Sequence, residues 1–157
     1  MIEENLGVLY EKIAQTIVDT IPEEWLKVYL YGELTDDVRK SFFFYCPTEG
    51  SPVYSHDIPE VFNIERAEYK RLWRQLLNDL QELWHEFKNN GHEPWTSLTL
   101  IFDHSGDFKI EYNYEDLSEA NDNERQIIWE HKYLGLIPKD EDDKRFLDAF
   151  LNQPKIN

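Results

Sequence analysis

The chain has 157 residues, a length that predicts one domain spanning residues 1–157. Its 32 Asp and Glu residues against 16 Lys and Arg give a formal net charge of −16, which disfavours direct binding to nucleic acid and to anionic membrane surfaces. Aromatic residues make up 15% of the chain and supply enough apolar area to argue against intrinsic disorder.

The N-terminus and the cysteine content indicate a cytoplasmic protein. Glu3 and Glu4 lie where a secretory signal would carry basic residues, and no apolar run approaches the roughly 20 residues that cross a membrane. Cys46 is the only cysteine, so no disulfide can form within the chain, and a buried free thiol is expected.

The first third of the chain predicts a helix followed by strands. Residues 3–20 are expected to be helical, because apolar residues recur at every third or fourth position. Residues 25–34 alternate between aliphatic side chains and aromatic or charged ones, as in a strand with one covered face. Residues 38–46 are expected to run back as its hairpin partner, and residues 53–56 to form a short third strand.

A long central helix and a second hairpin are predicted next. Asn63 is the expected N-cap of the helix, and Gly91 suits the position just after its last turn. Downstream, the pattern predicts strands over residues 98–102 and 108–114 and helices over residues 124–134 and 140–151.

Together these elements predict an α+β fold: an antiparallel sheet built from two hairpins, with helices packed mainly on one face, a long central helix and two C-terminal helices. The helix-facing side of the sheet is expected to carry Leu26, Val28, Leu30, Leu98, Leu100 and Phe102. The opposite face is expected to carry Tyr29, Tyr31, Phe43 and Tyr45 from the first hairpin and Lys109, Glu111, Asn113 and Glu115 from the second.

The acidic residues are concentrated in two stretches. Residues 1–37 and residues 103–124 each carry a net charge of −7, whereas the rest of the chain is nearly balanced. Aromatic side chains beside acids suit an interface for a basic protein. The alternative is that another helix covers the aromatic face and the acids are solvated. The candidate partner-binding residues are Tyr29, Tyr31, Asp103, Asp107, Glu111, Glu115, Asp116 and Glu119.

No cofactor or metal site is predicted, because nucleotide-binding glycine motifs and zinc-binding histidine pairs are absent. The strongest enzyme-like pattern combines Asp103, Asp107 and Lys109, the residue types that surround Mg²⁺ in metal-dependent hydrolases. The alternative is a hairpin tip with solvated acids. The acidic run at residues 140–143 suits the first turn of a helix better than a cation site.

Four motifs follow one another along the chain: LYEKIAQTIVDTIPEEWLKVYLYGEL from Leu9, SHDIPEVFNI from Ser55, EPWTSLTLIFDHSGDFKIEYNYEDL from Glu93 and WEHKYLGLIP from Trp129. The most specific string among them is Glu93-Pro94-Trp95-Thr96. Over residues 6–143 these motifs resemble those of the YezG/EsaG-like immunity proteins, which are antitoxins of Gram-positive bacteria.

This resemblance implies a protein that binds and neutralises the C-terminal nuclease domain of an LXG toxin exported by the type VII secretion system, without catalysis. The matching positions, such as Trp25, Trp95 and Gly135, are expected to determine the fold and not to contact the toxin. A general acidic scaffold or DNA mimic is a further alternative, which would bind many basic proteins alike.

Overall fold

The computed structural model describes residues 2–154. The chain divides into two compact units, Met1–Glu115 and Asp116–Asn157. The first unit contains a sheet and its helices, and the second contains two helices. Among the described residues, no helix is both long enough and apolar enough to cross a membrane.

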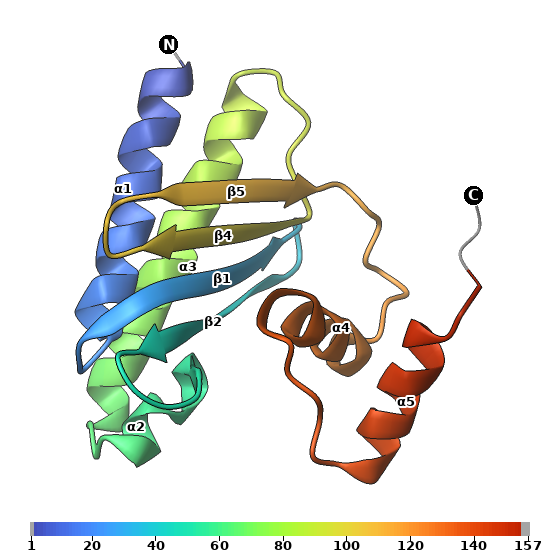
Figure 1. Cartoon of the computed structure of the whole chain (residues 1–157). Helices are drawn as coiled ribbons and strands as arrows, with labels where there is room; N and C mark the ends of the chain where they lie inside the picture. Colours follow the sequence, from blue (N-terminus) through green and yellow to red (C-terminus); the bar gives the residue numbers. More distant parts are fainter. Residues whose placement is uncertain (1, 155–157) are drawn as a thin grey trace. The chain divides into compact units, whose positions relative to one another are not determined.

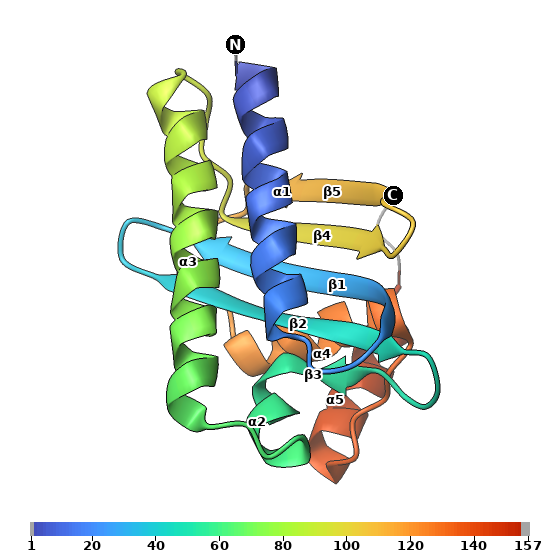
Figure 2. The ribbon, with the colours of Figure 1, turned by 90° about the vertical axis from the view of Figure 1, so that its left-hand side faces the viewer.

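The first unit is a five-stranded antiparallel sheet in the order β3-β2-β1-β4-β5, with two long helices on one face (Figures 1 and 2). The predicted α+β fold, with its two hairpins and long central helix, is therefore confirmed. Its elements are α1 (Ile2–Thr20), β1 (Trp25–Leu34), β2 (Arg39–Pro47), β3 (Val53–Tyr54), the 3-10 helix η1 (Ser55–Asp57), α2 (Ile58–Val61), α3 (Arg66–Asn89), β4 (Ser97–Asp103) and β5 (Phe108–Asn113).

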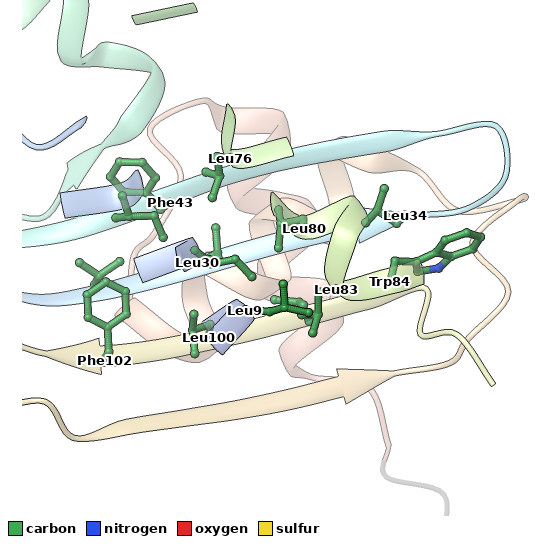
Figure 3. Close-up of a cluster of buried hydrophobic side chains, with 14 of the residues drawn as sticks. Leu9, Leu30, Leu34, Phe43, Leu76, Leu80, Leu83, Trp84, Leu100 and Phe102 are labelled. Atoms are coloured by element: carbon green, nitrogen blue, oxygen red, sulfur yellow. The ribbon is translucent and has the colours of Figure 1, made fainter. Parts of the chain in front are cut away.

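The core lies between the sheet and the two long helices (Figure 3). Gly32 of β1 faces α3, and a Cβ at this position would lie 3.1 Å from Leu80 Cδ1. Glycine therefore permits close contact between the helix and the central strand. The buried side chains labelled in Figure 3 are Leu9, Leu30, Leu34, Phe43, Leu76, Leu80, Leu83, Trp84, Leu100 and Phe102.

A buried carboxylate joins the two helices. Asp79 of α3 is only 1% exposed, yet both of its oxygens accept hydrogen bonds. Thr16 of α1 donates to Oδ2 at 2.6 Å, and Gln75 donates to Oδ1 at 2.8 Å. These bonds offset the loss of hydration of the carboxylate, and the bond from Thr16 fixes the position of α1 along α3.

The register of the first hairpin corrects three of the predicted positions. Phe43 pairs with Leu30 and Tyr45 pairs with Val28, so both aromatic side chains lie in the helix-facing core and not on the opposite face. Leu26 is 42% exposed, because a register shift between Trp25 and Lys27 interrupts the alternation of β1.

The ends of α3 show one wrong prediction and one that is confirmed. Asn63 is not the N-cap, because it adopts a positive φ of 53° and Glu65 is the capping residue. Gly91 follows the last turn with a φ of 76°, as expected for a left-handed residue after a helix. Its amide donates to the Lys88 carbonyl and the His92 amide donates to the Phe87 carbonyl, which are the two bonds of a Schellman motif.

The third strand is shorter than predicted. Only Val53 and Tyr54 pair with β2, after which the chain turns into η1. Ser55, which is 1% exposed, continues the pairing with a side-chain atom: its Oγ accepts a hydrogen bond from the Phe43 amide of β2 at 3.0 Å. Cys46, the predicted buried thiol, is half-buried, and loss of hydration raises its pKa.

The second unit contains α4 (Asp122–Leu134) and α5 (Glu141–Leu151), the two predicted C-terminal helices. Asp140 caps α5 by accepting a hydrogen bond from the Asp143 amide at 3.0 Å, so the acidic run there belongs to a helix start. Gly135 ends α4 with a φ of 67°, which explains the glycine of the WEHKYLGLIP motif.

Candidate protein-binding site

The sheet face opposite α1 and α3 carries two aromatic residues of β1. Tyr29 and Tyr31 are half-buried there, in register with Phe44 and Phe42 of β2. The rings of Tyr31 and Phe42 stack at 5.2 Å between centroids, and Phe42 and Phe44 are only 2% and 5% exposed. Of these four aromatic side chains, the two tyrosines are therefore partly accessible and the two phenylalanines are buried. Phe42 and Phe44 occupy this face, where the sequence predicted Phe43 and Tyr45.

The second hairpin brings an acidic residue onto the same face. Thr99 of β4 pairs with Tyr31 on one side and with Glu111 of β5 on the other, so these side chains form one cross-strand row. Tyr29 and Lys109 lie in the neighbouring row. The Lys109 ammonium is 2.9 Å from Glu111 Oε1, an exposed ion pair of small energetic value.

Glu33 is a buried carboxylate of this face that the sequence pattern did not single out. It is 4% exposed and accepts a hydrogen bond from the Tyr31 hydroxyl at 2.8 Å. The bond fixes the orientation of the Tyr31 ring, which suits a surface that binds a partner without reorganisation. The signal in the sequence is the acid two residues beyond Tyr31 on the same side of an alternating strand.

The tip of the second hairpin is an acidic turn. Asp103 Oδ1 accepts hydrogen bonds from the Ser105 amide at 2.9 Å, the Ser105 hydroxyl at 2.6 Å and the Asp107 amide at 3.2 Å. These bonds, chiefly that of the Ser105 hydroxyl, lower the pKa of Asp103 and keep its charge. Gly106 completes the turn with a φ of 97°, and Asp107 is exposed beside it.

The geometry of the turn does not favour the metal-dependent hydrolase. Asp103 is occupied by the turn and Lys109 pairs with Glu111, so the three residues of that hypothesis do not form one cluster. Among the side chains that the structure describes, no group of three or more His, Cys, Asp or Glu residues is placed to hold a metal ion.

The acidic stretch 103–124 crosses the boundary between the two units. Glu115 ends the first unit, and its amide donates to Asn113 Oδ1 at 2.8 Å. Asp116 and Glu119 belong to the second unit. The Asp116 carboxylate accepts a hydrogen bond from the Ser118 amide at 3.0 Å, which lowers its pKa. The candidate residues therefore form one group in the first unit and a smaller one in the second.

Known proteins match this chain along nearly its whole length. The model of the YezG-like immunity protein family matches residues 6–148. The chain is 44% identical over 146 residues to Immunity protein YezG of Bacillus subtilis, covering 91% of this chain and 97% of that protein. It is 42% identical over 157 residues to the protein of the same name in Bacillus spizizenii, covering 97% and 98%.

A third relative carries a different name. The chain is 34% identical over 142 residues to Type VII secretion system protein EsaG of Staphylococcus aureus, covering 88% of this chain and 87% of that protein. The family match and the three relatives confirm the resemblance read from the motifs. The chain belongs to the YezG-like immunity protein family and is not an enzyme.

Proposed function

We propose that this chain binds the C-terminal nuclease domain of a type VII-secreted LXG toxin and neutralises it by stoichiometric contact in the cytoplasm of the producing cell. The observation that carries the proposal is membership of an immunity protein family together with similarity to a protein named for the type VII secretion system. An immunity protein acts on a toxin, and secretion gives that toxin a route out of the cell.

The charge of the chain supports a nuclease as the target. A nuclease needs a basic surface to hold the phosphates of DNA. A protein with a net charge of −16 is attracted to that surface and lowers its availability to DNA. The proposed contact residues of the first unit are Tyr29, Tyr31, Asp103, Asp107, Glu111 and Glu115, and those of the second are Asp116 and Glu119.

A titration of DNA cleavage tests the proposal. Increasing amounts of the chain are added to a fixed concentration of the cognate toxin's nuclease domain at low salt, and cleavage of a plasmid is followed. Cleavage should fall in proportion to the added protein and stop at a fixed molar ratio. Full cleavage at equimolar protein would refute the proposal.

An unrelated nuclease serves as the specificity control. An immunity protein discriminates among nucleases, because the wrong partners meet mismatched charges and shapes. The unrelated enzyme should therefore keep its activity at the ratio that silences the cognate domain. Equal inhibition of both enzymes would instead identify a general DNA mimic.

A further inference from the structure

An apolar groove lies between α1 and the β4–β5 hairpin, on the helix-facing side of the sheet. Its volume is 320 Å³, near the lower end of the range of ligand sites. Figure 2 shows α1 crossing this side of the sheet over β4. The groove is lined mainly by Gly7, Tyr10, Ala14, Leu100, Phe102 and Phe108.

The groove is open because α1 carries small residues where it passes the hairpin. Gly7 and Ala14 line it, and a Cβ added at Gly7 would meet nothing within 4 Å. Tyr10 lies between them and turns toward β5, where its hydroxyl forms a hydrogen bond with the Tyr112 hydroxyl and its ring lies 5.7 Å from that of Phe108. Phe108 remains 56% exposed, a large apolar ring at the rim of the groove.

The strand beside the groove is the last in the sheet. β5 follows β4 at the end of the strand order, so one row of its backbone amides and carbonyls does not pair within the sheet. Such an edge accepts an extended segment of another protein as an additional strand, while pockets beside it bind alternate side chains. The groove lies where such a side chain would point.

The charge around the groove is acidic. Glu11 is the one charged residue among those lining it, and Asp107 directly follows the lining residue Gly106 at the hairpin tip. Lys109 lies on the opposite face of β5, where it pairs with Glu111. An occupant with an apolar side chain between basic residues therefore complements the groove, whereas an acidic segment is repelled.

We propose that the groove and the edge of β5 bind a basic extended segment of the toxin, which inserts one apolar side chain between α1 and the β4–β5 hairpin. This inference rests on the proposed function and adds the chemistry of the recognised segment: an aliphatic or aromatic residue flanked by Lys or Arg. It also adds a second aromatic contact of the first unit, at Tyr10, Phe102 and Phe108 on the helix-facing side, to the one proposed at Tyr29 and Tyr31 on the opposite face.

Filling the groove tests the inference. Gly7→Trp and Ala14→Phe each place a ring in it from a different point of α1, and Val8→Trp adds the same ring at a neighbouring position that is 65% exposed and does not line it. The probe is a catalytically inactive nuclease domain of the cognate toxin, with binding followed by surface plasmon resonance. Circular dichroism selects the groove variants that keep the wild-type helix content and melting temperature.

Both groove variants should weaken binding by about tenfold to a hundredfold, mainly through faster dissociation, because the apolar side chain loses its site. Val8→Trp should bind within about twofold of the wild type. Hydrogen exchange should show new protection of the β5 amides in the wild-type complex. Wild-type affinity and inhibition in the groove variants, or no protection of β5, would overturn the inference and leave the proposed function standing.

Three other outcomes also decide the matter. An equal loss of binding in Val8→Trp would show that the effect is not local to the groove, and would overturn the inference. A wild-type dimer in light scattering that Gly7→Trp dissociates would assign the groove to a second copy of the chain. Failure of the wild type itself to bind the nuclease domain would refute the proposed function instead.

Discussion

Trp95→Ala should lower the free energy of unfolding of the first unit by about 3–5 kcal/mol, the usual cost of removing a fully buried tryptophan. Trp95 is 0% exposed and its ring lies 6.1 Å from that of Tyr112. Its carbonyl also accepts a hydrogen bond from Trp84 Nε1 at 3.0 Å, which joins the end of α3 to the start of β4. Urea denaturation followed by far-UV circular dichroism measures the change.

Trp95→Phe is the matched control for this substitution. Among the described residues, Trp95 Nε1 is buried without a hydrogen-bond partner, so its removal leaves no acceptor unsatisfied. The phenylalanine should therefore destabilise the unit by less than half as much as alanine. A free energy of unfolding for Trp95→Ala within about 1 kcal/mol of the wild type would contradict this assignment of Trp95 to the core.

Reversal of three acids in the second hairpin and directly after it should slow binding to the nuclease domain. Asp107→Lys, Glu111→Lys and Glu115→Lys together raise the net charge from −16 to −10, because each change adds two positive charges. Association at low salt should slow by about tenfold or more, and its dependence on ionic strength should weaken, since electrostatic steering acts before contact. Stopped-flow measurement at several salt concentrations gives both quantities.

The control for this variant carries the same net charge on another part of the first unit. Glu49, Glu60 and Glu65 lie in the β2–β3 loop, in α2 and before α3, toward the β3 edge of the sheet, opposite to β5. Reversing these three should slow association much less. Equal slowing by both variants would mean that total charge matters and that the hairpin has no special role.

The sequence predicted the strands better than it predicted which side chains share a face. β1 alternates between aliphatic and other residues, so the core positions of Val28 and Leu30 could be read directly. Residues 42–45 of β2 are all aromatic, and a run without alternation carries no information about its phase. Only the pairing with β1 places Phe43 and Tyr45 in the core.

Local backbone geometry explains the wrong N-cap. Asparagine is a common capping residue, but it is also one of the few residues that tolerate a positive φ, and α2 ends at Val61, two residues before Asn63. The chain uses Asn63 for the turn between α2 and α3. Gly91 had no such competing role, and its place after α3 was predicted correctly.

The candidate site could be predicted only in part from the sequence. Tyr29, Tyr31 and Glu111 share a face because two strands of regular alternation determine it. The groove beside β5 could not be predicted, since it depends on small residues of α1 lying opposite a hairpin about 90 residues later in the chain. The division of the acidic stretch between two units could not be predicted either, because no proline- or glycine-rich linker marks the boundary.

The central claim is that the acidic surface of this chain occupies the basic surface of a nuclease, and competition with DNA tests it most directly. A catalytically inactive nuclease domain is first bound to a fluorescent DNA duplex, and the chain is then added while anisotropy is followed. DNA should be released in proportion to the added protein until none remains bound. A stable ternary complex of DNA, nuclease domain and this chain would contradict the account.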